Sequence, residues 1–366
     1  MILVRHRRSV VEVATFRTDV SYEDGRHPTS VKFTTAEEDA RRRDFTINGL
    51  FLDPIENRVI DYVCGQRDIN DKVLRAIGSP DERFAEDHLR LLRAVRFAAR
   101  FDLRIDDGTA LAIRRHATHL PRISPERIAE ELRLMLVPPT RCAAWRLLWT
   151  LGLIGVVFRD MNPDPSPPLR DGRSLVCALS HQRDVSFGLA LAAASLCYRW
   201  QNSTEAQGIS FHLASDEVRC ALRALRKLLR ISNDEEHEVE GTLLGLRPLL
   251  EGHPSIAQLK RFLQRDTAEL SIELLNAMIV INEYRERAEW LLGQFANLTD
   301  VSPPPLLTGD DLVARGLTPG PAFKRALDFV YDEQLEGRVT TRAQALELGE
   351  RKVREAEAEQ QQRPAR

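Results

Sequence analysis

From Asp81 onward, apolar residues recur at the three- and four-residue spacing of an amphipathic helix, and this pattern constrains the fold more than any other feature of the chain. The pattern begins in DERFAEDHLRLLRAVRFAARF, where Pro80 and Asp81 mark a helix start, and it resumes from Asp184 to about Asn297. In SPERIAEEL, Ser124 occupies an N-cap position and is followed by a proline and an acid. The sequence therefore predicts that most of the chain is helical.

Only the first 63 residues read as β-strands. Two apolar runs, Met1–Val4 and Val10–Phe16, flank a basic turn and predict a β-hairpin. Further short strands are expected in SVKFT, INGLFLD and VIDYV, and proline-rich breaks follow at Asn162–Arg173 and Val301–Pro305. We therefore predict an α+β fold, with a small N-terminal sheet and helical domains behind it. No run approaches ~18 uninterrupted apolar residues, so no membrane span is expected.

The composition is that of a globular protein, with 43% hydrophobic and 29% charged residues. The five cysteines form no CxxC pair, which indicates reduced thiols in a cytoplasmic protein and no zinc site. The net charge is −2, yet arginine recurs persistently between Arg41 and Arg133. A phosphate-bearing ligand and a coding bias toward arginine explain this enrichment equally well.

Four polar residues step by three along the first predicted helix: Asp87, Arg90, Arg93 and Arg96. They form either a solvated charged face or one wall of a cleft, with Leu91, Leu92 and Val95 facing the core. As a cleft wall, a carboxylate beside a guanidinium can accept from an exocyclic amino group and donate to the adjacent ring acceptor. Cytosine and adenine carry that pair of groups, whereas uracil and guanine present the opposite order.

A second candidate site lies in RRRDFTINGLFLDP. Arg43 suits phosphate oxygens through forked donation, Asp44 could accept from a ribose hydroxyl, and Asn48 lies in the same element. Alone, this segment could equally be a basic patch before a buried strand. The interpretation as a binding site is supported by the motifs that follow this segment in order along the chain.

The ordered motifs are EVATFR (Glu12–Arg17), DGRHP (Asp24–Pro28), RRDFTIN (Arg42–Asn48), DxxxGxxDI (Asp61–Ile69), ERFxEDxLRxLRAVRFA (Glu82–Ala98) and SPERIAEEL (Ser124–Leu132). This set resembles the class II bacterial tRNA nucleotidyltransferase and poly(A) polymerase family. The resemblance is specific over residues 10 to about 135 and weaker in LLTGDDLVARGLTPGP near the C-terminus. It implies a nucleotidyltransferase head followed by an all-α neck, body and tail.

The resemblance also implies roles for the residues of these motifs. Arg43, Asp44 and Asn48 would shape the nucleotide site, and Asp87 with Arg90 would be the protein template for the base. The following arginines, Arg93 and Arg96, would contact the nucleotide, and Asp61, Gly65 and Asp68 would form a flexible linkage between head and neck. The implied domains are a partial head over 1–63, a neck over 64–160, a body over 174–300 and a tail over 306–350.

Members of that family open with a GGxVRD turn and an Asp-x-Asp pair that holds two magnesium ions, and the 366 residues contain neither. The resemblance therefore implies a chain truncated at its N-terminus relative to the family. Glu12 is the nearest candidate for a third acidic residue near the metals, and no other metal ligand is expected. Three explanations are open: Met1 is not the true start, the gene is truncated, or a remnant is retained as a binding protein.

The implied function is template-independent addition of AMP, and possibly CMP, to an RNA 3′ end, from ATP and possibly CTP with Mg²⁺. CCA addition to tRNA and poly(A) addition both remain open, and we expect this chain to be inactive by itself. The alternative is a non-catalytic nucleotide- or RNA-binding remnant. A phosphohydrolase domain is not expected, because Ser186–Trp200 lacks a paired His-Asp and His181, His212 and His237 have no ligand spacing.

Overall fold

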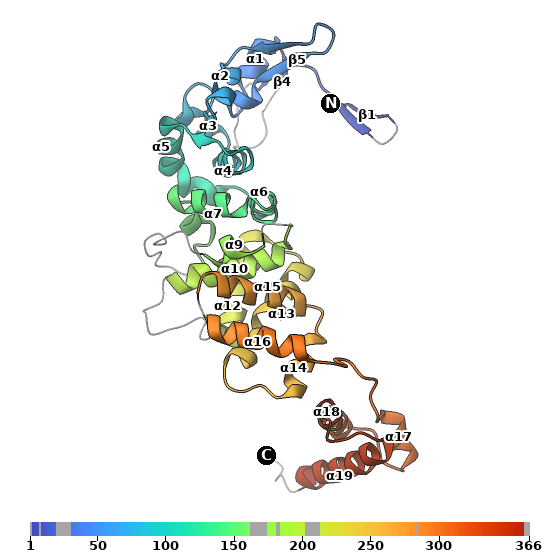
Figure 1. Ribbon diagram of the computed structural model, residues 1–366. Coiled ribbons are helices and arrows are strands. Elements are labelled where there is room, and N and C mark those ends of the chain that lie inside the picture. Colours follow the sequence, from blue (N-terminus) through green and yellow to red (C-terminus); the bar gives the residue numbers. More distant parts are fainter. Residues whose placement is uncertain are drawn as a thin grey trace. The chain divides into compact units, whose positions relative to one another are not determined.

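The computed structural model in Figure 1 describes residues 2–6, 9–19, 31–161, 174–180, 184–201, 213–282 and 284–361. Within these residues the expected α+β fold is confirmed, with every strand before residue 106 and mostly helices from residue 80 onward. The DGRHP motif and the proline-rich break at 162–173 lie outside the described residues, as do His181 and His212.

The described strands form four two-stranded pairs. Three pairs are antiparallel: β1 (Ile2–His6) with β2 (Ser9–Val13), β3 (Arg17–Asp19) with β4 (Val31–Phe33), and β5 (Leu50–Asp53) with β6 (Arg58–Asp61). The fourth pair, β7 (Val73–Leu74) with β8 (Arg104–Ile105), is parallel. It lies beyond residue 63, where no strand was predicted, because each of its strands is only two residues long. The predicted N-terminal hairpin is therefore confirmed, as are the strands in SVKFT, INGLFLD and VIDYV. The short helices among them are α1 (Ala36–Arg41), the 3-10 helix η1 (Thr46–Asn48) and α2 (Gly65–Asn70).

The first long predicted helix is two helices, α3 (Pro80–Glu86) and α4 (Arg90–Phe101). The expected start at Pro80 is confirmed. The expectation that Asp87 continues the helix is wrong, because its backbone is extended (φ −146°, ψ 106°). Its Oδ1 accepts a hydrogen bond from the backbone N–H of Leu89, at 3.0 Å. A short polar side chain that bonds the backbone two residues on competes with the helical hydrogen bonds and ends the helix.

Helix α4 packs against α6 (Pro125–Leu136) and α7 (Arg141–Thr150). Its apolar side, Leu91, Leu92 and Val95, is fully buried as predicted. The remaining elements of this region are α5 (Asp107–His116), the 3-10 helix η2 (Ala117–Arg122) and α8 (Ile154–Val157).

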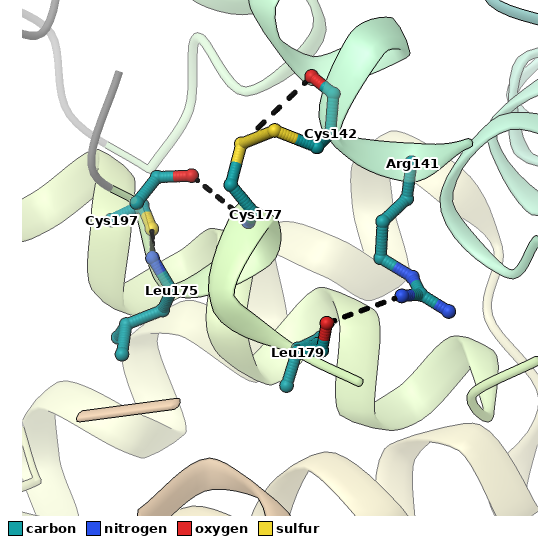
Figure 2. Close-up of a disulfide and its surroundings, with 7 residues drawn as sticks. Arg141, Cys142, Leu175, Cys177, Leu179 and Cys197 are labelled. Carbon is teal, nitrogen blue, oxygen red and sulfur yellow. Dashed lines mark hydrogen bonds between the residues drawn. A yellow bond between two sulfur atoms is a disulfide. The ribbon is translucent and has the colours of Figure 1, made fainter. Parts of the chain in front are cut away.

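Cys142 and Cys177 form a disulfide between α7 and α9 (Leu175–Ala178), as Figure 2 shows. The expectation of five reduced thiols is therefore wrong, because α7 and α9 bring together two cysteines that are 35 residues apart in the sequence. Beside the disulfide, the fully buried guanidinium of Arg141 donates to backbone carbonyls at the ends of α6 and α9, Leu179 among them. Carbonyl groups at helix C-termini favour a cation, and here they replace the water that Arg141 has lost.

The rest of the described chain is helical. Its helices are α10 (Phe187–Gln201), α12 (Ser215–Leu229), α13 (Asn233–Leu250), α14 (Ile256–Leu263), α15 (Ala268–Val280), α16 (Arg285–Asn297), α17 (Gly309–Ala314), α18 (Pro321–Leu335) and α19 (Arg342–Gln361). The chain divides into two compact units, residues 1–212 with 216–239, and 213–215 with 240–366. These units are coarser than the four predicted domains, which stay a prediction. No helix among the described residues is long and apolar enough to span a membrane, and the cytoplasmic location stays a prediction.

Candidate functional site

A cleft of about 510 Å³ lies in the first compact unit, between the loop after α1, the α3–α4 junction, α4 and α6. Its lining residues are Arg42, Arg43, Asp44, Asn48, Asp87, Leu89, Arg90, Arg93, Phe97 and Arg127. Six of the seven residues predicted to bind a nucleotide are therefore together in one cleft. The exception is Arg96.

Asp44 holds the loop after α1 against α4 and is itself only 7% exposed. Its Oδ1 accepts from the backbone N–H of Phe45 and from Asn48 Nδ2, both at 2.9 Å. Its Oδ2 accepts from Arg93 Nε at 2.8 Å and from the Arg93 terminal nitrogen at 2.7 Å. Charge-assisted pairs of this kind fix geometry as well as charge, so Asp44 acts first as the group that fixes Arg93 and Asn48 in place.

The arginine run before Asp44 is held by Asp39, which is 3% exposed. One carboxylate oxygen of Asp39 pairs with Arg42 at 2.7 Å and the other pairs with Arg43 at 3.0 Å. Arg43 also donates to the Asn48 carbonyl at 2.6 Å, and its guanidinium lies 4.7 Å from the centre of the Phe51 ring. The segment is therefore a fixed wall of the cleft, with two guanidinium groups oriented by one buried carboxylate.

Asp87 and Arg90 also line the cleft, where α3 ends and α4 begins. Arg127 from α6 donates to Asp87 Oδ2 at 2.9 Å. Arg90 donates to Glu86 at 2.6 Å, to the Arg83 carbonyl at 2.9 Å and to the Arg42 carbonyl at 3.5 Å. A carboxylate has about four acceptor positions and a guanidinium has five donors, so both groups keep capacity for a ligand.

Arg96 points to α6 instead of the cleft. It donates to Glu131 at 2.7 Å, and its guanidinium lies 4.3 Å from the centre of the Phe97 ring. Glu131 is 6% exposed and lies 3.9 Å from Arg93. The prediction that Arg96 contacts the ligand is therefore not supported by this geometry, because a buried carboxylate already holds its guanidinium.

Glu12 lies on β2, opposite Leu3 of β1, and is exposed. It does not belong to the residues that line the cleft. Its predicted role near a metal stays a prediction.

The DxxxGxxDI motif supports the cleft from behind through α2, which packs against η1. Burial would raise the pKa of Asp61, but backbone N–H groups of residues 63–66 outweigh it and hold that pKa below its ordinary 3.8. A side chain at Gly65 would meet the Thr46 carbonyl oxygen at 2.3 Å, so this position requires glycine. Asp68 is buried and accepts from the Thr46 hydroxyl at 2.7 Å and from Arg75.

Four residues of the cleft were not predicted from the sequence: Arg42, Leu89, Phe97 and Arg127. Phe97 follows Arg93 by four residues, and helical spacing alone could have placed it on the same face. No sequence pattern could have placed Arg127 in the cleft, because its position there depends on how α6 packs against α4. Phe97 contributes an apolar ring that packs edge-on against Phe45, with 5.9 Å between ring centres.

Two family models match the chain. The poly A polymerase head domain matches residues 1–75, and the "probable RNA and SrmB-binding site of polymerase A" matches residues 102–164. Among curated proteins, the chain is similar to CCA-adding enzymes of Streptococcus uberis and Geobacillus kaustophilus, 43% and 40% identical over 153 residues. These matches cover 42% of this chain and only 36% and 38% of the two relatives, a little over a third of their length.

Two solved structures are similar to this chain over most of its length. The Bacillus stearothermophilus CCA-adding enzyme, solved with CTP, superposes with a TM-score of 0.68 and 26% identity, covering 97% of this chain and 82% of that one. The Thermotoga maritima CCA-adding enzyme, solved with a tRNA, has a TM-score of 0.55 at 20% identity over 86% and 73% of the two chains, which shows the fold alone. These matches confirm the family resemblance predicted from the sequence.

Proposed function

We propose, from the premise that this chain resembles the tRNA nucleotidyltransferase and poly(A) polymerase family, that its cleft binds and selects the incoming nucleoside triphosphate of a tRNA nucleotidyltransferase. The observation that carries the proposal is the gathering of Arg43, Asp44, Asn48, Asp87, Arg90 and Arg93 around one volume of about 510 Å³. The names of the relatives favour CCA addition to tRNA, with CTP and ATP as substrates, over poly(A) addition.

Selection would come from Asp87 and Arg90 acting on the edge of the base. Both lie at the α3–α4 junction, where their existing hydrogen bonds fix them before a ligand arrives. The remaining carboxylate lone pairs of Asp87 would accept from the exocyclic amine of cytosine or adenine. The remaining N–H groups of Arg90 would donate to the adjacent ring nitrogen. Phe97 would give the ligand an apolar surface, and Arg43 would face its phosphates.

The carboxylates of the cleft do not fit a pair of magnesium ions. Asp44 is paired with Arg93, and Asp87 is paired with Arg127. Among the described residues, the one group of three or more possible metal ligands is made of histidines and lies outside the cleft lining. We therefore derive no chemical step through Mg²⁺ and assign to these residues binding and selection only.

The partner of the nucleotide would be the 3′ end of an RNA, as for the tRNA named with the Thermotoga maritima enzyme. The segment that matches the RNA-binding family model, residues 102–164, follows the cleft in the chain and contributes Arg127 to it. This assignment would place the RNA-contacting surface and the nucleotide cleft in the same compact unit.

Calorimetric titration of the purified chain with CTP, ATP, UTP and GTP tests the proposal. We expect CTP and ATP to bind about 5- to 150-fold more tightly than UTP and GTP, since a pair of matched hydrogen bonds discriminates by ~1–3 kcal/mol. Asp87→Asn and Arg90→Lys should remove most of that preference. The matched controls are Asp107→Asn and Arg100→Lys, two exposed residues whose changes should leave it intact. Equal affinity for CTP and UTP would disprove the selection mechanism.

The second candidate function, nucleotide and RNA binding without catalysis, is favoured by the pairing of both cleft carboxylates with arginines. It shares the predicted base preference, and the two functions differ only in nucleotide incorporation.

A further inference from the structure

Three histidine side chains from different elements converge behind α3, outside the cleft lining: His88 at the α3–α4 junction, His116 at the end of α5, and His119 in η2. Their ring centres lie 5.1–6.3 Å apart. One ring nitrogen from each lies within 4.8 Å of the other two. Three elements thus bring three imidazole rings together in one cluster.

One nitrogen of each ring has no hydrogen-bond partner among the described residues. The Nδ1 atoms of all three histidines are buried, and none has a hydrogen-bond partner among the described residues. His88 is itself only 9% exposed. Buried polar groups are nearly always hydrogen-bonded, and leaving one unpaired costs ~1–3 kcal/mol. Three such atoms within one cluster of histidine rings favour a ligand that accepts electron pairs from nitrogen.

One histidine of the cluster, His116, has a carboxylate beside its Nε2 atom. His116 Nε2 lies 3.1 Å from Asp81 Oδ1. When Nε2 of His116 carries the proton and donates to this carboxylate, Nδ1 of the same ring keeps a lone pair that can bind a metal. Arg115 orients Asp81 in turn, through bonds of 2.6 and 3.2 Å. A carboxylate that fixes the tautomer of a histidine is the usual outer partner of a metal ligand.

We propose that His88, His116 and His119 bind one divalent transition-metal ion of the zinc class through one ring nitrogen each. Imidazole nitrogen suits Zn²⁺, Co²⁺, Ni²⁺ and Cu²⁺, whereas Mg²⁺ and Ca²⁺ require oxygen. At metal–nitrogen distances of ~2.0–2.1 Å, tetrahedral ligands lie ~3.4 Å apart, so the rings close inward on binding. Water would fill the fourth position.

Such an ion would act on the structure of the first compact unit. It would join the α3–α4 junction to α5 and η2, next to Asp87 in the chain. The spacing of the cysteines does not indicate a metal site. The spacing of the histidines does not indicate this site either, because His88 is distant in the sequence from HATH (His116–His119). It is independent of the proposed nucleotide selection.

The experiment uses the full chain without an affinity tag, stripped with a chelator and titrated with Zn²⁺ or Co²⁺. We expect one ion per chain by elemental analysis and a Co²⁺ spectrum without thiolate-to-metal charge transfer. His116→Asn and His119→Asn should each weaken binding at least about a hundredfold, and Asp81→Asn should weaken it about ten- to a hundredfold. His253→Asn, a change at an exposed histidine, should leave binding unchanged.

X-ray absorption spectroscopy of the zinc-loaded wild-type chain identifies the metal ligands directly, so the proposal can be tested even if a histidine variant fails to fold. The expected first shell contains three imidazole nitrogens at ~2.0–2.1 Å and no sulfur. A sulfur ligand, the absence of stoichiometric binding, or undiminished binding in both folded histidine variants would each overturn the proposal.

Discussion

Both carboxylate oxygens of Asp44 accept hydrogen bonds within the protein, and they connect two elements that line the cleft. One oxygen binds its own loop through Phe45 and Asn48, and the other binds Arg93 of α4. The residue expected to touch a ribose therefore has a structural task as well. A substitution of Asp44 tests the structural role through the free energy of unfolding and the ligand-binding role through nucleotide affinity, because the two quantities are measured independently.

Asp44→Asn should lower the free energy of unfolding by about 3 kcal/mol, the low end for breaking a buried ion pair, because Arg93 is one-third exposed. Urea unfolding measures this change. Asp107→Asn, at an exposed side chain, should shift the free energy by no more than about 0.5 kcal/mol. The double variant with Arg93→Met should lose less than the sum of the single changes. Strict additivity would show that Asp44 and Arg93 are not coupled.

At the scale of elements, local sequence patterns predicted what the backbone does nearby, and packing determined the rest. The helix start at Pro80 and the buried face of α4 follow from spacing and capping alone. Asp87 broke the predicted helix, because its side chain bonds the Leu89 backbone. Arg96 was predicted in the cleft, yet α6 places Glu131 against it, and helical periodicity carries no information about that neighbour.

Helix α17 begins with a capping box formed by Thr308 and Asp311. The pKa of Asp311 reports on the contact between α17 and α19. Asp311 accepts from Thr308 at the start of α17 and from Arg342 at the start of α19. The bond from Arg342, followed by those from Thr308, lowers the pKa of Asp311 from 3.8 to about 2. Because the folded-state pKa is depressed, its stabilisation is present above pH 3.8 and is lost as pH falls through about 2.

An NMR titration of the Asp311 carboxyl carbon should therefore give a midpoint near 2. In Arg342→Gln the midpoint should rise toward 3.8. Arg351→Gln removes an arginine of the same helix that pairs with Glu355, and it should leave the midpoint in place. A midpoint near 3.8 in the unmodified chain would contradict the contact between α17 and α19.

The disulfide between α7 and α9 predicts a definite thiol count. Without reductant, we expect two fast-reacting thiols in the folded chain, since Cys64 and Cys220 are exposed and burial raises the pKa of Cys197 to about 11. Denaturant should raise the count to three, and reductant to five. Five thiols in denaturant alone would contradict the disulfide.

The same bond should contribute to stability. A crosslink that closes a 35-residue loop stabilises the folded state by about 4 kcal/mol in the chain-entropy account. The double variant Cys142→Ser/Cys177→Ser should lose a comparable amount in urea unfolding, whereas Cys220→Ser, at an exposed free thiol, should not.

At the scale of the whole molecule, helix α13 is divided between the two compact units: its residues up to 239 belong to the first unit and its later residues to the second. Residues 213–215 also belong to the second unit. The proline-rich break at 162–173 lies inside the first unit. The proline-rich composition of this break predicted a domain boundary. The helices on its two sides, α7 and α9, pack together and share a disulfide. The cleft, the histidine cluster and the disulfide all belong to this first unit.

We predict that the 366-residue chain, tested by itself, binds nucleotides without transferring them to RNA. The sequence contains no Asp-x-Asp pair, and the two carboxylates of the cleft are held by arginines. Phosphoryl transfer depends on metal ions that neutralise the triphosphate, and their loss costs many powers of ten in rate. We expect no labelled ATP or CTP to be incorporated into a tRNA lacking its 3′ end, with Mg²⁺ present. A CCA-adding enzyme run in parallel gives the positive control. Incorporation that requires Mg²⁺ and disappears in Asp87→Asn would overturn this expectation and assign catalysis to the chain itself.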